Sequence, residues 1–110
     1  MKLYHALSKE RYDQQIQDGV FKPYWNKLMK DMPCGIWATE NPVLSYNASS
    51  INGSGEEYEI LEIDCANLDV DNTGDWKVPG RNYYIIREWE IPLSCIRKFD
   101  DMDHFKLNWN

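Results

Sequence analysis

The sequence predicts an α+β fold, in which a mixed or antiparallel sheet packs against two or three short helices. Two segments, 58–65 and 82–91, are dense in β-branched and aromatic residues and contain neither Gly nor Pro. Two other segments begin with residues that favour helix starts. The helical signals lie in the first half of the chain and the strongest strand signals lie later. This segregation favours a sheet packed against a few helices.

The first segment reads as strand, helix and strand. Loose alternation of apolar residues over residues 2–6 indicates a strand, and Ser8 is a favourable N-cap for a helix. Apolar residues recur at helical spacing, so we expect a helix over 9–18. Gly19 is a suitable C-terminal stop for this helix, and the apolar pair at 20–21 then begins a second strand.

The middle of the chain predicts a loop, a strand and a second helix. Residues 22–33 have no clean period and are expected to form a loop with a helical turn. The apolar run 34–39 predicts a strand. Asn41 can cap a helix and Pro42 fits a first helical turn, so we expect a helix over 42–49.

The second half alternates strands with turn-rich connections. Strands are expected where β-formers are dense, and connections are expected where Gly, Ser, Asn and acidic residues gather. Pro92 is positioned to end the second of these strands. The predicted strands are 58–65, 82–91 and 105–109, and the predicted connections are 49–57 and 67–79.

Chain length and cysteine content predict one domain over residues 1–110, with a core that needs no disulfide. With 43% hydrophobic and 14% aromatic residues, the chain carries enough apolar surface to fold unaided. Cys34, Cys65 and Cys95 are odd in number, about thirty residues apart and without a C-x-x-C pair. We therefore expect free thiols in apolar surroundings rather than disulfides or a zinc site.

The charge pattern disfavours nucleic acid and membranes as partners. The net charge is −6 and the twelve basic residues are scattered, so a phosphate backbone would be repelled. No segment approaches the roughly 20 apolar residues needed to span a bilayer. The acidic residues between 64 and 75 lack the spacing of a calcium loop, and we expect no metal site there. The sequence predicts a cytoplasmic protein.

Three separated segments resemble motifs of the ADP-ribosyltransferase fold. The first is Leu-Tyr-His-Ala-Leu-Ser at 3–8, followed by Asp-Gly-Val at 18–20. The second is the stretch 35–46, which begins Gly-Ile-Trp-Ala-Thr, and the third runs from Asn-Tyr-Tyr-Ile-Ile to an Ile-Pro turn over 82–96. Together they cover about half of the chain. This family uses NAD and includes the poly-ADP-ribose polymerases and small bacterial and phage toxins, and the resemblance implies a small split sheet.

The resemblance implies roles near an NAD site for three of the matched residues. His5, followed by the small residue Ala6, matches the histidine that hydrogen-bonds the adenosine ribose. Trp37 stands where the family commonly has a tyrosine that packs on nicotinamide. Ser45 matches the serine that holds the carboxamide, whereas Tyr46 falls two positions early for the second stacking aromatic. A strand histidine and a core tryptophan are the structural alternatives for His5 and Trp37.

The expected catalytic glutamate is the point where the sequence departs from the family pattern. Alignment on the Ile-Pro turn places Tyr83 at that position, and a phenol is neutral at pH 7. Glu88 lies further along the predicted strand and is the candidate carboxylate if the register shifts. Solvated carboxylates at Glu88 and Glu90 are the structural alternative.

Two functions follow from these assignments. An active chain would transfer ADP-ribose from NAD to a macromolecular acceptor, such as a protein, or would hydrolyse NAD. The alternative is a catalytically silent, acidic α+β binding module that acts by protein–protein contact. Its small size and acidity suit a phage or mobile-element inhibitor of a host protein.

Overall fold

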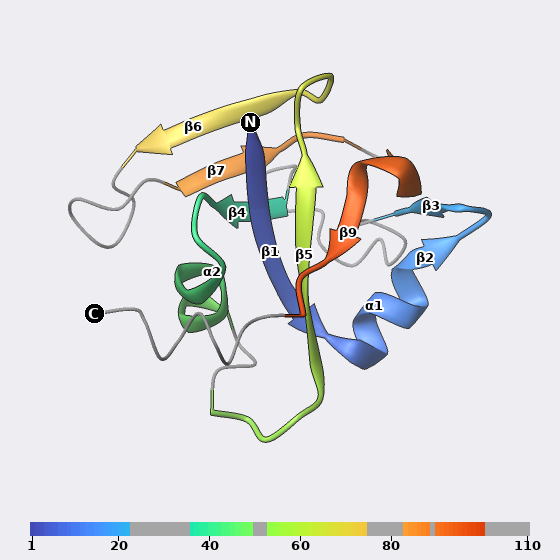
Figure 1. Ribbon diagram of the computed structural model, residues 1–110, viewed down its shortest axis with the longest axis vertical. Coiled ribbons are helices and arrows are strands. Elements are labelled where there is room, and N and C mark those ends of the chain that lie inside the picture. The colour runs from blue at the N-terminus through green and yellow to red at the C-terminus, as the bar shows by residue number, and fades with distance from the viewer. Residues whose placement is uncertain (23–35, 50–52, 75–82, 89, 101–110) are drawn as a thin grey trace, which may run out of the picture.

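The computed structural model describes residues 1–22, 36–49, 53–74, 83–88 and 90–100. In this part of the chain, two antiparallel sheets are combined with two α-helices and a 3₁₀ turn, so the predicted α+β class is confirmed (Figure 1). In chain order the elements are β1 (Lys2–Ser8), α1 (Lys9–Gln15), β2 (Ile16–Gln17), β3 (Val20–Phe21), β4 (Ile36–Thr39), α2 (Pro42–Ala48), β5 (Tyr58–Asp64), β6 (Val70–Gly74), β7 (Tyr83–Ile86), β8 (Ile91–Pro92), the 3₁₀ turn η1 (Leu93–Cys95) and β9 (Ile96–Lys98).

The larger sheet has the strand order β6-β7-β4-β1-β5-β9, and the smaller has the order β2-β3-β8. β1 pairs with β5 along its full length, from Lys2 to Ser8. It pairs with β4 at a single position, where Tyr4 lies opposite Thr39. Figure 1 shows β1 and β5 running together while β4, β7 and β6 lie across them. The sheet therefore changes direction between β1 and β4.

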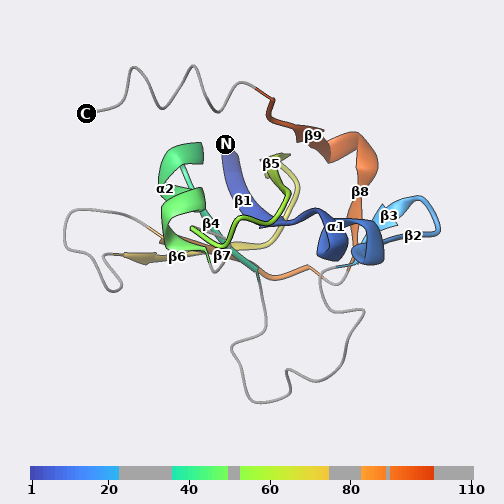
Figure 2. The same cartoon turned by 90° about the horizontal axis from the view of Figure 1, so that it is seen from below.

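Apolar side chains cover both faces of the larger sheet. Because side chains alternate along a strand, β1 sends Leu3 and Leu7 to one face and Ala6 to the other. α2 covers the Ala6 face, and α1 lies on the opposite side of β1 from α2 in both views (Figures 1 and 2). The first face carries the larger cluster, whose buried members are Leu3, Leu7, Phe21, Ile36, Ala38, Leu61, Ile63, Cys65, Tyr84, Ile86 and Ile91.

The start of α1 follows the prediction and its end does not. The Ser8 hydroxyl accepts a hydrogen bond from the N–H of Arg11 at 3.1 Å, as expected for an N-cap. The helix ends at Gln15 rather than Asp18. Asp18 and Gly19 have φ angles of 55° and 78° and form the turn between β2 and β3. Gly19 is thus a hairpin residue, and the prediction that it stops the helix is wrong.

The predicted second helix is confirmed to within one residue. The Asn41 side chain accepts hydrogen bonds from the N–H groups of Val43 at 2.8 Å and Leu44 at 3.1 Å, and Pro42 occupies the first turn. These bonds satisfy backbone donors that a helix start leaves open. The cap fixes where α2 begins, directly after β4.

The strand pattern of the second half differs from the prediction in three places. β6 lies within the stretch predicted as a turn-rich connection, where pairing with β7 outweighs its low strand propensity. The predicted strand 82–91 is divided, because β7 ends at Ile86 and β8 begins at Ile91. β9 was not predicted. The loop expected at 22–33 and the strand at 105–109 lie outside the described residues, apart from Lys22.

The described cysteines are free, as the sequence predicts. Cys65 is buried and its thiol donates to the carbonyl oxygen of Ile63 at 3.4 Å, while Cys95 is half-buried. Burial raises the pKa of the Cys65 thiol to about 11, so it stays protonated at neutral pH. Cys34 lies outside the described residues. Within the described ranges, no helix has the length and apolar character to cross a membrane.

A buried carboxylate ties β5 to both of its neighbouring strands. The Glu62 side chain is 7% exposed and lies 2.8 Å from the Arg97 guanidinium, 3.1 Å from the Tyr4 hydroxyl and 3.4 Å from the Lys2 ammonium. Burial alone would raise the pKa of Glu62, but the hydrogen bonds from Arg97 and Tyr4 outweigh it and hold this pKa below its ordinary value of 4.5.

Replacing Glu62 by Gln should lower the free energy of unfolding at pH 7 by about 1–3 kcal/mol, because the charge-assisted bonds are lost. A carboxylate with a depressed folded pKa stabilises the protein above its unfolded pKa, and this stability disappears as the pH falls through the folded pKa. The difference between wild type and Glu62→Gln should therefore shrink below pH 4.5 in urea unfolding experiments.

The matched control is Glu57→Gln, whose carboxylate is 84% exposed and pairs with Lys9 at 3.9 Å. Its effect should stay within about 0.5 kcal/mol at every pH. A Glu62→Gln protein as stable as wild type at pH 7 would contradict the role assigned to the buried carboxylate.

Candidate functional site

A small pocket lies where β1 and β4 diverge, and we call it the β1–β4 pocket. Its volume is about 100 Å³, and it is bounded by β1, β4, β7 and the α2 end. Five of the predicted site residues line it: His5, Ala6, Trp37, Ser45 and Tyr83. The full lining in the described part of the chain is His5, Ala6, Trp37, Ala38, Thr39, Ser45, Ser49 and Tyr83.

Strand register explains why these residues meet. β1 and β4 are in register only where Tyr4 lies opposite Thr39, and Thr39 in turn lies opposite Tyr83 of β7. The next residue of β1, His5, reaches across the diverging strands, and its Nδ1 lies 2.8 Å from the carbonyl oxygen of Trp37. The histidine thus bridges β1 and β4 at the wall of the pocket.

This contact determines which nitrogen of the imidazole carries a proton, and burial determines the charge of the ring. A carbonyl oxygen only accepts hydrogen bonds, so Nδ1 of His5 carries the proton that it donates to Trp37. Burial lowers the pKa of His5; the bond to Trp37 raises it and the positive charge of Arg11 lowers it, and the net pKa lies below 6.5. At neutral pH the ring is therefore uncharged, with an accepting lone pair on Nε2.

Two aromatic side chains form a second wall of the pocket. Trp37 of β4 and Tyr83 of β7 have ring centroids 6.3 Å apart at an interplanar angle of 75°, an edge-to-face arrangement. Tyr83 is 6% exposed, whereas Trp37 is half-buried. The residue at the position expected for a glutamate therefore lines the pocket as a phenol.

A hydrogen-bonded cluster fastens α2 to the strands beneath the pocket. The Ser45 hydroxyl donates to the carbonyl oxygen of Tyr4, which joins α2 to β1. The Thr39 hydroxyl donates to the carbonyl oxygen of Asn41 at 2.6 Å, and its oxygen lies 3.0 Å from that of Ser45. Both Thr39 and Ser45 are buried. These bonds fix the position of Ser45 in the pocket lining.

Two predicted site residues lie apart from this lining. Tyr46 packs against Tyr58, with ring centroids 4.8 Å apart, in the cluster under α2. The Glu88 carboxylate accepts a hydrogen bond from the N–H of Asp69 at 2.8 Å. The expectation that Glu88 continues the strand of Tyr83 is wrong, since β7 ends at Ile86.

Thr39, Ala38 and Ser49 line the pocket but were not predicted. Thr39 had a recognisable signal, because a Thr that ends a strand two residues before a capping Asn can bond the following backbone. The N–H of Asn41 indeed donates to the Thr39 hydroxyl at 3.3 Å. Ser49 follows the last residue of α2, and its hydroxyl bonds the Tyr46 carbonyl oxygen at 2.6 Å.

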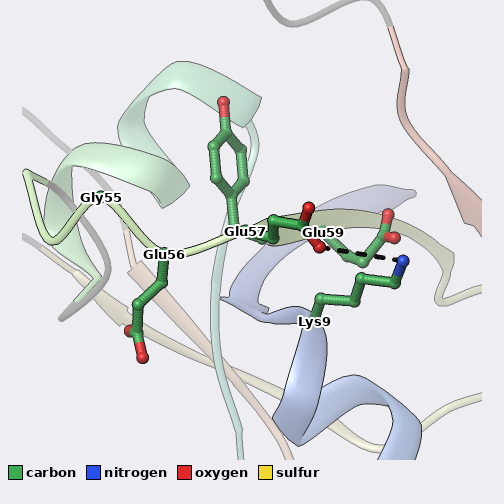
Figure 3. A pocket seen from close by; sticks show the side chains of 6 residues that line it. Lys9, Gly55, Glu56, Glu57 and Glu59 are labelled. Carbon is green, nitrogen blue, oxygen red and sulfur yellow. Dashed lines mark ion pairs between the residues drawn. The ribbon is translucent and has the colours of Figure 1, made fainter.

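A second, shallow hollow lies on the surface beside α1 and the start of β5. Figure 3 shows Lys9 and Glu57 turned toward one another and Glu56 pointing away. The Lys9–Glu57 ion pair spans 3.9 Å between side chains that are 53% and 84% exposed. Such an open, solvated pair contributes little energy, and we assign no function to this hollow.

The chain was also compared with known proteins. No protein-family model, curated protein or solved structure matches it. Among the residues that the structure describes, no three potential metal ligands cluster.

The His5 imidazole should titrate with a midpoint below 6.5 in an NMR experiment that follows its ring resonances. A histidine with a depressed folded pKa binds a proton more tightly when unfolded, so stability is complete above pH 6.5 and falls as the pH is lowered toward the folded pKa. His5→Gln should remove this slope from urea unfolding free energies.

The second histidine supplies the control, because His104→Gln identifies which resonance belongs to His5. A His5 midpoint at or above 6.5 would contradict the neutral imidazole described above.

Proposed function

We propose that this chain is an NAD-binding domain of the ADP-ribosyltransferase type, which holds the nicotinamide end of NAD in the β1–β4 pocket. The observation that carries the proposal is the meeting of residues from separate motifs. His5 and Ala6 from the first motif, Trp37 and Ser45 from the second and Tyr83 from the third all line one pocket. The direction change between β1 and β4 is consistent with the split sheet of that family.

The size of the pocket limits an enclosed ligand to part of a single ring, far less than a whole dinucleotide. Its volume of about 100 Å³ is below the roughly 300–1,000 Å³ of pockets that enclose drug-sized ligands. A cavity of about 150 Å³ holds benzene, so this smaller pocket would enclose only part of a nicotinamide ring, and the rest of the ring would lie at its open side. The remaining parts of NAD would lie outside it, along the surface.

The lining residues offer suitable contacts for this ring and its ribose. Trp37 and Tyr83 both line the pocket, and an aromatic ring attracts a cation such as the positively charged pyridinium of NAD where its face meets that cation. The resemblance implies a bond from His5 to the adenosine ribose. With only the nicotinamide end in this pocket, the Nε2 lone pair of His5 would instead accept a hydrogen bond from the nicotinamide ribose, while Nδ1 stays bonded to Trp37. The bond from Nδ1 to Trp37 thus fixes the orientation of the imidazole before a ligand binds at Nε2.

The lining is poorly equipped for ADP-ribose transfer. Cleavage of the nicotinamide–ribose bond develops positive charge on the ribose, which a nearby carboxylate would stabilise. Tyr83 occupies the position where the family resemblance implies a glutamate, and no carboxylate is among the described lining residues. We therefore propose that the domain binds NAD and that any transfer to a protein acceptor is slow.

Tyr83 also favours the second candidate, a catalytically silent domain that acts through contact with a protein partner. Tyr83 lines the pocket but lacks the negative charge with which a glutamate would assist cleavage of the nicotinamide–ribose bond. Under this alternative, NAD binding would tune or stabilise the domain rather than supply a substrate.

NAD at about 1 mM should change the tryptophan fluorescence of the wild-type protein, since Trp37 lines the pocket. Trp37→Phe keeps a ring but loses this reporter, so the signal should fall while calorimetry still detects binding. His5→Ala should weaken binding at least about 3- to 10-fold, because it removes a hydrogen bond to the ligand and also the bond to Trp37 that joins β1 and β4. Wild-type protein that gives neither a fluorescence change nor heat with NAD would refute the proposal.

Replacing Tyr83 by Glu should create or increase turnover of NAD, measured as release of nicotinamide and as labelling with radioactive ADP-ribose. The matched control is Tyr83→Gln, which has nearly the same shape without the charge and should remain at the wild-type level. Circular dichroism establishes that both variants fold, because Tyr83 is 6% exposed and its replacement disturbs packing. Equal turnover in folded Glu and Gln variants would exclude Tyr83 as the catalytic position.

A further inference from the structure

Arg11 is the one basic side chain within the described ranges that forms no ion pair. Each of the others lies beside a carboxylate, and these are Lys2, Lys9, Lys22, Arg87, Arg97 and Lys98. Arg11 is exposed near the start of α1. A guanidinium has several N–H donors, so this one is available to an anionic ligand.

Arg11 and the histidine of the β1–β4 pocket lie on the same side of β1. Side chains alternate along a strand, so His5 shares the face of Leu3 and Leu7. Tyr12 of α1 packs against the cluster on that face. Figure 1 shows α1 continuing directly from the end of β1. The helix therefore brings Arg11 to the side of the sheet on which His5 lies.

The positive charge of Arg11 acts on the imidazole at the pocket wall. Burial is the main cause that lowers the pKa of His5, the bond to Trp37 opposes it, and the charge of Arg11 lowers it further. In physiological salt a charge acts strongly over roughly 10 Å or less. The guanidinium is therefore close enough to reach a group that leaves the pocket beside His5.

The pyrophosphate of NAD is such a group. Bond lengths of about 1.5 Å place the nearer phosphate about 5–6 Å from the hydroxyls of the nicotinamide ribose. A ribose bonded to Nε2 of His5 would thus bring the phosphates out of the pocket on the way to Arg11. The net charge of −6 repels phosphates, and neither Lys nor Arg is among the described lining residues. A cation outside the pocket is needed to offset this repulsion.

We propose that Arg11 binds the pyrophosphate of NAD, and that its guanidinium donates hydrogen bonds to the phosphate oxygens. The planar guanidinium matches two oxygens of one phosphate, which an ammonium group cannot do. The ligand is then held at two places, with the nicotinamide end in the β1–β4 pocket and the phosphates at α1. The identity of the ligand as NAD rests on the function proposed above, whereas the anion site rests on the unpaired guanidinium.

The experiment measures the affinities of three probes for the wild type and Arg11→Gln by isothermal titration calorimetry at pH 7.5. NAD has both the ring and the pyrophosphate, nicotinamide riboside has no phosphate, and ADP-ribose has the pyrophosphate without nicotinamide. Arg11→Gln should weaken NAD and ADP-ribose at least about tenfold, because charge-assisted hydrogen bonds are lost. It should not weaken nicotinamide riboside, a cation that the guanidinium repels.

Lys9→Gln is the matched control, because it removes the same charge from the same helix but from a side chain paired with Glu57. It should change the affinity for NAD less than about twofold. Arg11→Lys keeps the charge without the planar fork and should fall between wild type and Arg11→Gln. Without any ligand, the NMR titration midpoint of His5 should rise in Arg11→Gln and stay unchanged in Lys9→Gln.

The outcomes separate this inference from the proposed function. Unchanged NAD affinity in folded Arg11→Gln, an equal loss in Lys9→Gln, or an equal loss for nicotinamide riboside would overturn the inference and leave NAD binding intact. Binding of ADP-ribose that depends on Arg11, without binding of nicotinamide riboside, would support the inference and refute the nicotinamide pocket. Absence of binding by all three probes would overturn both.

Discussion

The hydrogen bond from His5 Nδ1 to the Trp37 carbonyl oxygen is the contact on which the β1–β4 pocket depends. β1 is paired with β5 throughout its length but with β4 only at Tyr4, so the ladder between β1 and β4 is not continued beyond that point. Beyond Tyr4, the His5 side chain joins the two strands, with Nδ1 lying 2.8 Å from the Trp37 carbonyl oxygen. The carbonyl oxygen of Trp37 thereby has the hydrogen-bond partner that buried polar groups need. The two strands stay apart beside this bond, where the pocket lies.

Hydrogen bonds within the protein also determine which polar atoms line the pocket. Ser45 and Thr39 hold α2 against β1 and β4 by donating their protons to backbone oxygens. Their remaining lone pairs can accept hydrogen bonds, and with a neutral His5 the described lining carries no charged side chain at neutral pH. Tyr83 stands where the family resemblance implies a glutamate, so the described lining offers no carboxylate to stabilise positive charge on a ribose.

Local signals were sufficient to predict the parts of the fold that depend on local chemistry. The caps at Ser8 and Asn41 were predicted because a side-chain oxygen bonds N–H groups two or three residues away. β6 was missed because it is a strand through pairing with β7, not through its composition. Glu88 was predicted to lie on the same strand as Tyr83, but that strand, β7, ends at Ile86. The Glu88 carboxylate instead bonds the N–H of Asp69. The divergence of β1 from β4 depends on the tertiary arrangement and leaves no local signal.

The central claim is that a nicotinamide ring binds between His5, Trp37 and Tyr83. Its most direct test is an isotope-filtered NMR experiment that records intermolecular nuclear Overhauser effects between unlabelled nicotinamide or NAD and the labelled protein. We predict contacts from the pyridine ring protons to the side chains of Trp37 and Tyr83 and to the His5 imidazole. Contacts confined to other surfaces, such as the hollow beside Lys9, would contradict the account.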